Sequence, residues 1–223
     1  MKCATKHYMV RTALRPDFAL ALLTLQACSR AEVLDRLSKL GINQLYFPGL
    51  TTTKPNGPHI PILAPPLDVL KRRKRIVVVI NDALQDLGIL AYRQLQRELG
   101  LDGGSVVSFA KELGRLQDGT AYEAPGLIVM NTGQLLYSHK YNRAMTMRSW
   151  YALPRKSIAH DAIRIHDQEN HVEGHRNAIE HIKTVFDQLL CDPDRVAPEA
   201  EVYVVAIEGG AEKTLEVFKD DCK

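Results

Sequence analysis

The 223-residue sequence lacks the cysteine spacings that build disulfide scaffolds or zinc sites. It has four cysteines, Cys3, Cys28, Cys191 and Cys222, and no two of them form a C-x-x-C pair. Scattered, unpaired cysteines are typical of proteins in a reducing compartment. We therefore expect a protein of the nucleus or the cytoplasm.

Long hydrophobic runs and nucleotide-binding motifs are also absent from the sequence. No stretch of about 18 apolar residues occurs, so we expect no membrane-spanning helix. The phosphate-loop pattern G-x-x-x-x-G-K-[ST] and the dinucleotide pattern G-x-G-x-x-G are missing. The stretch "HVEGH" (171–175) has its glutamate at the wrong place for the zinc motif H-E-x-x-H. We expect neither a cofactor nor a metal.

The composition is that of an ordinary globular domain, with 45% hydrophobic and 25% charged residues and a net charge of +3. One dense basic run, "KRRKR", stands directly before an apolar stretch and comprises Lys71, Arg72, Arg73, Lys74 and Arg75. This run is typical of a solvated strand edge. A contact with a phosphate backbone and a nuclear-import patch are the alternatives.

Three continuous apolar runs, "IVVVI" (76–80), "GLIVM" (126–130) and "VYVVAI" (202–207), predict strands buried on both faces. Apolar residues near a 3.6-residue period predict helices over 85–99 and 177–190. Strands that alternate with helices indicate an α/β fold with a mostly parallel sheet and helices on both faces.

The first part of the chain predicts different elements. Helical periodicity runs from Phe18 to a stop at Gly41, and "NQLYF" (43–47) with "HIPIL" (59–63) predicts a peripheral hairpin whose prolines suit a sheet edge. We expect a largely helical extension over 1–30 and a single α/β domain over 31–223. The stretch from 132 to 175 predicts a long irregular excursion, either a functional lid or a surface loop.

The stretch "VYVVAIEGGAEK" (202–213) has the outline of a nucleophile elbow, G-x-S-x-G. Ala206, Glu208 and Gly210 occupy the three spaced positions, and Gly209 is also small. The nucleophile position therefore holds a glutamate. No histidine follows within 209–223, so a triad in the usual chain order cannot be assembled. A structural Glu208 that accepts backbone N–H bonds at the start of a helix is a sufficient explanation.

Other polar residues suit structural roles. Asn81 and Asp82 follow the first central strand, where they could cap the next helix. His166, His171 and His175 belong to a polar stretch that predicts a loop leading into the helix of His181.

Several stretches together resemble the Argonaute-binding-protein (Arb-type) domain family, over about residues 31–218. They include "LGINQLYFPG", "PHIPILAPP", "RIVVVINDALQDLGILAYR", "PGLIVMNTGQLLYS" and "RAMTMRSWYALPRKSIAH". The family includes a subunit of the Argonaute small-RNA chaperone complex and the tail domain of class II fungal histone deacetylases. The resemblance implies an α/β-hydrolase-like sheet used mainly for protein interaction in gene silencing. Some relatives keep a serine where this chain has Glu208. A full hydrolase sheet also continues past the elbow helix, so the domain is shortened or the chain is a fragment.

The leading hypothesis is a non-catalytic interaction domain in small-RNA or heterochromatin silencing, with partners of the Argonaute or chromatin-silencing type. Its candidate contact surface consists of Trp150, Arg143, Arg148, Arg155 and Lys156, because aromatic and arginine side chains are common interface anchors. One rival is a hydrolase whose base is His160 or His166. Another is direct nucleic-acid binding through the basic run and the basic cluster over 143–156.

Overall fold

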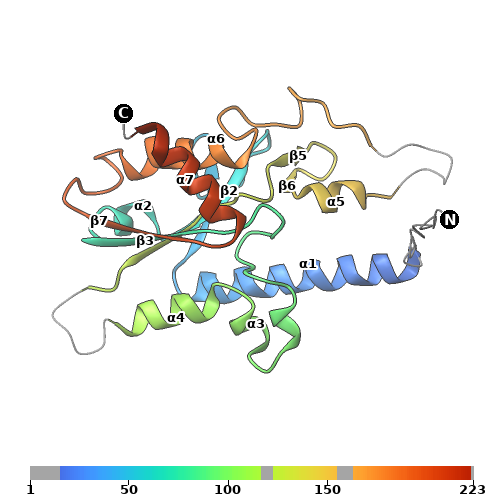
Figure 1. Ribbon diagram of the computed structural model, residues 1–223, viewed down its shortest axis with the longest axis horizontal. Coiled ribbons are helices and arrows are strands. Elements are labelled where there is room, and N and C mark those ends of the chain that lie inside the picture. The colour runs from blue at the N-terminus through green and yellow to red at the C-terminus, as the bar shows by residue number, and fades with distance from the viewer. Residues whose placement is uncertain (1–15, 117–122, 155–162, 222–223) are drawn as a thin grey trace, which may run out of the picture.

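A computed structural model describes residues 16–116, 123–154 and 163–221 (Figure 1). Within these ranges a five-stranded sheet with the order β1-β2-β4-β3-β7 forms the centre of the molecule. The strands are β1 (Asn43–Phe47), β2 (Ile60–Ala64), β3 (Arg75–Ile80), β4 (Gly126–Val129) and β7 (Glu201–Ala206). β4, β3 and β7 are parallel, whereas the β1–β2 hairpin joins β4 in antiparallel orientation.

β3 lies inside the sheet and is buried on both faces, as its apolar run predicts. Ile76, Val78 and Ile80 contribute to one hydrophobic cluster, and Val77 and Val79 contribute to the other. Successive strand residues point to opposite faces, so a run of apolar residues supplies two cores at once.

Helices cover both faces, which confirms the predicted α/β layering (Figure 1). One face packs against α6 (Ala178–Val185), its π-helical continuation (Phe186–Leu190), α7 (Gly209–Asp221) and α2 (Leu67–Leu70). The other packs against α1 (Pro16–Lys39) and α4 (Val107–Arg115), through residues that include Val33, Leu37 and Val107. α1 ends just before Gly41, whose φ is +78°, and the predicted boundary between extension and domain falls inside this helix.

The helix predicted over 85–99 is wrong. The segment contains only a short 3-10 turn at Gln94–Gln96 before α3 (Gly100–Gly103). Gly88 has a φ of +82°, which ends any helix at that point. The carbonyl of Ile89 accepts from the buried Asn81 side chain (2.6 Å), and the amide of Leu90 donates to Gly104 O (2.9 Å). The backbone groups of the segment thus bond to other parts of the fold.

The hairpin predicted over 43–47 and 59–63 is present at one end of the sheet, where β1 is the edge strand, but β2, which contains Pro61, lies inside the sheet between β1 and β4. Pro61 is tolerated there because β2 pairs with β4 only at Leu63 and Val129. Beyond this pair the Asn131 side chain donates to Pro61 O (2.9 Å), in place of a backbone hydrogen bond between β2 and β4.

In its described part, 132–154 and 163–175, the excursion predicted to be irregular contains three short elements, β5 (Leu136–Ser138), β6 (Arg143–Met145) and α5 (Met147–Tyr151). β5 and β6 form a second, two-stranded antiparallel sheet. Thr146 caps α5, since its side chain accepts from the Ser149 amide (3.1 Å). Each element is too short to show a clear hydrophobic period in the sequence.

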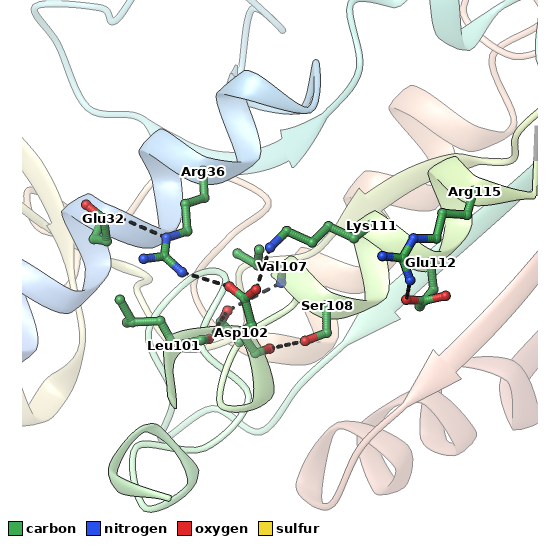
Figure 2. Close-up of polar contacts among 10 residues, drawn as sticks. Glu32, Arg36, Leu101, Asp102, Val107, Ser108, Lys111, Glu112 and Arg115 are labelled. Atoms are coloured by element: carbon green, nitrogen blue, oxygen red, sulfur yellow. Dashed lines mark hydrogen bonds and ion pairs between the residues drawn. The ribbon is translucent and has the colours of Figure 1, made fainter. Parts of the chain in front are cut away.

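Asp102 on α3 ties α1 to α4 (Figure 2). Its carboxylate binds Arg36 of α1 (2.8 Å) and Lys111 of α4. Lys111 first, and then Arg36, holds the pKa of the Asp102 carboxyl below its ordinary value. A short loop helix thus joins the two long helices of this face.

β7 forms one edge of the five-stranded sheet and is exposed, which corrects the expectation of a strand buried on both faces. Val202, Tyr203, Val204 and Val205 are 37–51% exposed. A continuous apolar run does not distinguish a central strand from an edge strand, because the position in the sheet depends on the other strands.

Candidate functional site at the carboxyl edge of the sheet

The turn between β7 and α7 has the backbone of an elbow. Glu208 has a φ of +50°, in the left-handed region that non-glycine residues rarely adopt. The Gly210 amide donates to Ile207 O and the Ala211 amide donates to Glu208 O, both at 2.9 Å. The chain therefore passes from strand to helix within a few residues.

The small residues of the elbow are required by its packing against the end of β3. A Cβ atom added to Gly210 would lie 2.5 Å from Ile80 O and 2.8 Å from Asn81 O. A Cβ atom added to Gly209 would overlap the Asp82 carboxylate. The contacts at Gly210 are with backbone atoms, so a side chain there forces a shift of the backbone, whereas at Gly209 the Asp82 side chain can move aside.

The Glu208 side chain is exposed. Within the described part of the chain its carboxylate makes no hydrogen bond and no ion pair. The structural role expected for Glu208, as an acceptor of backbone N–H bonds, is therefore wrong. The carboxylate projects from the strained turn into solvent.

The side chains of Asn81 and Asp82 organise the turn after β3. The sequence predicts that they cap a helix, but they form hydrogen bonds within the loop instead. Asn81 Oδ1 accepts from the Asp82 amide (2.8 Å), and Asp82 Oδ1 accepts from the Leu84 amide (2.6 Å). The backbone amides of this turn thus bond to its own side chains, which is typical of Asx-type turns.

The loop after β4 locks against the loop after β3. Thr132 Oγ1 donates to Asn81 O (2.6 Å), and Gln134 Nε2 donates to Asp86 Oδ1 (2.9 Å). The cavity left between the two loops has a volume of about 10 Å³. A single water needs about 10–15 Å³ by a similar measure, so this space holds no substrate.

Asp86 is the buried centre of this network. Its carboxylate pairs with Arg30 of α1 (2.9 Å) and accepts from Tyr92 Oη (2.5 Å), in addition to Gln134. Burial, and then the Asp86 charge, raises the pKa of the Tyr92 hydroxyl, which therefore stays a donor. These bonds compensate the charge of the buried carboxylate, so Asp86 serves as a structural link between α1 and the loop after β3.

His175 and His181 form a buried pair next to Phe47. The Asn131 amide donates to His181 Nε2 (3.1 Å), so the His181 proton is on Nδ1 and is donated to His175 Nδ1 (2.8 Å). The His175 proton is then on Nε2, which has no partner in the described structure. Burial lowers the pKa of His175 to about 4 and holds that of His181 well below its ordinary value. Both rings are neutral at pH 7.

The residues of the predicted contact surface do not form one exposed surface in the described structure. Trp150 is only 3% exposed and its Nε1 donates to Ile163 O (2.8 Å), so this ring belongs to a core and cannot anchor a partner. Arg143 and Arg148 are exposed. Arg155 and Lys156 lie outside the described residues, as does His160.

The basic run lies around the start of β3, where several of its charges pair within the fold. Lys71 approaches Asp194 (3.7 Å), Arg72 approaches Asp68 (3.4 Å) and Arg73 approaches Glu123 (3.8 Å). The Arg75 guanidinium donates to Glu123 O (3.4 Å), while Lys74 is exposed and its carbonyl accepts from the Glu201 amide (2.8 Å). Acidic neighbours offset much of the positive charge available to a nucleic-acid backbone.

The proposed alternative base His166 is exposed and makes no hydrogen bond with Glu208. Within the described ranges, no cluster of three or more His, Cys, Asp or Glu side chains is arranged to hold a metal ion. No helix in those ranges is both long and apolar enough to cross a bilayer.

Comparison with known proteins adds one finding. A family model described as the Arb2 domain matches residues 17–222, which is nearly the whole chain. No curated protein and no solved structure gives a significant match. Because the family model covers far more than half of the sequence, the chain belongs to the Arb2 domain family.

Proposed function

We propose that this Arb2 domain is a non-catalytic protein-interaction module that acts in small-RNA or heterochromatin silencing, in the nucleus or the cytoplasm. Its sheet is an α/β-hydrolase-like sheet that keeps the elbow and lacks the nucleophile and base of a hydrolase. The positive φ at Glu208 supports the elbow, and the solvent-exposed carboxylate supports the loss of a nucleophile with its base.

The exposed edge of β7 is the observation that carries the interaction role. Glu201 N–H donates to Lys74 O (2.8 Å) and Ile207 N–H donates to Ile80 O (2.9 Å). Since backbone amides alternate in direction along a strand, the amides of Val202, Val204 and Ala206 point away from β3. The N–H and C=O groups of these three residues form a row of donors and acceptors without a strand partner in the described structure.

Stable proteins usually protect such an edge with lysine, proline or a bulge. The stretch from Val202 to Ala206 has none of these, and four of its side chains are large, apolar and exposed. An extended segment of a partner protein that adds to β7 would satisfy the backbone groups and cover the side chains together. Argonaute-type or chromatin-silencing proteins are the partners that the family suggests.

A proline at position 204 tests this proposal. Val204→Pro removes an amide that points to the free edge and leaves the amides bonded to β3 intact, so we expect the fold to persist. In affinity purification of the full chain from cells, the wild type should enrich silencing proteins and Val204→Pro should lose them.

Val204→Thr is the matched control, because it keeps the amide and the branched side chain, and it should bind as the wild type does. The proposal fails if the folded wild type enriches no silencing protein. It also fails if Val204→Pro, with an unchanged melting temperature, still enriches the same partners.

A further inference from the structure

A pocket lies away from the β7 edge and is lined by residues of α1, the β1–β2 hairpin and the β5–β6 hairpin. The pocket has a volume of about 190 Å³. This is more than ten times the roughly 10–15 Å³ that one water needs, so the pocket has room for a small ligand or for the side chain of a partner.

Positive charge dominates this pocket. Arg30 of α1, Lys54 of the β1–β2 connection and Arg143 of β6 line it, and no Asp or Glu is among its lining residues within the described chain. Asp86 compensates Arg30 (2.9 Å). In the described structure Lys54 and Arg143 pair with no carboxylate, so two positive charges are left over.

The pocket also holds a neutral histidine. His59 is buried, and its Nδ1 lies 2.8 Å from Gly57 O, so Nδ1 carries the proton and Nε2 is a free acceptor. Burial, together with the charge of Lys54, lowers the pKa of His59. Desolvation, and then repulsion from Arg30, lowers the pKa of Arg143. The cations thus repel one another across the pocket, and a bound anion would relieve that repulsion.

We propose that this pocket binds a phosphate monoester. Such a group carries a charge of about −1.5 to −2 at pH 7, which matches the two uncompensated cations, whereas a single carboxylate would leave one of them unpaired. Its three oxygens suit the planar guanidinium of Arg143 together with the ammonium of Lys54. The Nε2 atom of His59 can accept a hydrogen bond from the P–OH group of a monoanionic phosphate.

Isothermal titration of the full chain tests this site, at constant ionic strength adjusted with chloride. The probes are inorganic phosphate, O-phosphoserine and a short phosphoserine peptide. We expect saturable binding to one site, about tenfold weaker in Arg143→Gln and in Lys54→Gln. Arg148→Gln should stay within about twofold of the wild type, because Arg148 is exposed but does not line the pocket.

The probes also distinguish two sources of the same chemistry. Equal affinity for O-phosphoserine and the peptide indicates a free monoester as ligand. Tighter binding of the peptide, with none by its unphosphorylated form, indicates a phosphorylated protein side chain. The proposal is overturned if no probe binds saturably, or if Arg143→Gln and Lys54→Gln melt and bind as the wild type does. In the wild type, a change in the ¹⁵N shift of His59 Nε2 on addition of a probe reports binding at this pocket, so this test does not depend on the stability of the variants.

Discussion

Glu208 is held in a backbone conformation that suits glycine, although its side chain contacts nothing that would favour it there. The left-handed conformation costs a non-glycine residue about 1–2 kcal/mol. That cost is usually tolerated where a function needs the turn. Within the described residues the Glu208 side chain makes no hydrogen bond or ion pair that would offset this cost.

Replacing Glu208 with glycine should therefore stabilise the protein. We expect Glu208→Gly to raise the free energy of unfolding by about 0.5–1 kcal/mol, since relief of the strained φ exceeds the added entropy of the unfolded chain. Urea denaturation measures this change. Glu208→Ala removes the carboxylate but keeps the strain, so it should match the wild type within about 0.5 kcal/mol. A glycine variant no more stable than the alanine variant would show that the turn is unstrained.

Gly210 should tolerate no side chain. Gly210→Ala places a methyl group 2.5 Å from Ile80 O, so we expect a loss of about 2–3 kcal/mol in the free energy of unfolding. Gly57→Ala is the control, because an added Cβ there meets no atom within 4 Å. Thermal denaturation of both variants checks the difference, and equal melting temperatures would contradict the packing of the elbow against β3.

At the level of elements, one carboxylate, that of Asp102, links α1, α3 and α4. We expect Asp102→Asn to lower the free energy of unfolding by about 1 kcal/mol at pH 7, a modest value because the side chain is partly exposed and solvent screens the pairs. The folded pKa of Asp102 lies below its ordinary value of 3.8, so this contribution is present above about pH 4 and is lost as the pH falls further.

The ion pair between Glu112 and Arg115 provides the control for Asp102, because it is highly exposed and lies within α4. Glu112→Gln should change the free energy of unfolding by less than about 0.5 kcal/mol in urea denaturation. If both variants lose the same stability, Asp102 does not join the helices.

The sequence correctly predicts the helices and strands that follow from the hydrophobic pattern of their own side chains. α1, α6 and the three parallel strands show a clear hydrophobic pattern, and the structure has all of them. The segment from 85 to 99 has a helical pattern too, but Asn81 and Gly104 bind its backbone and prevent a helix. A hydrogen bond from a residue outside the segment does not alter the hydrophobic period within it, so the pattern alone cannot reveal the bond.

The same distinction applies to the candidate sites. The need for a small residue at Gly210 follows from the elbow pattern, since the constraint is local. The network of Asp86 was not predicted, because its partners Arg30, Tyr92 and Gln134 lie far apart in the sequence. No fixed spacing connects these four residues, so only the fold brings them together.

Across the whole molecule, the buried histidine pair makes stability depend on pH. His175 has a folded pKa of about 4 against an ordinary value of 6.5. As the pH falls, this residue is therefore protonated in the unfolded chain before it is protonated in the folded chain. Stability is complete above pH 6.5 and falls by about 3 kcal/mol for this residue as the pH drops to 4. Urea midpoints measured between pH 7.5 and pH 4.5 test the slope.

His175→Gln should flatten this slope, since glutamine takes up no proton, although stability at pH 7 falls because the ring is lost from a packed core. The same substitution at the exposed His166 should leave the slope as it is in the wild type. An unchanged slope in His175→Gln would mean that the pair does not control acid unfolding.

Trp150 is the single tryptophan, and from α5 it packs against Leu136 and Met145 of the two-stranded sheet. Its burial gives the protein one tryptophan fluorophore, in an apolar environment. Met145 also lines the phosphate pocket, so the emission wavelength of Trp150 reports at once on the second sheet and on occupancy of the neighbouring pocket. Ligand titrations and unfolding can thus be followed by fluorescence in the unlabelled protein.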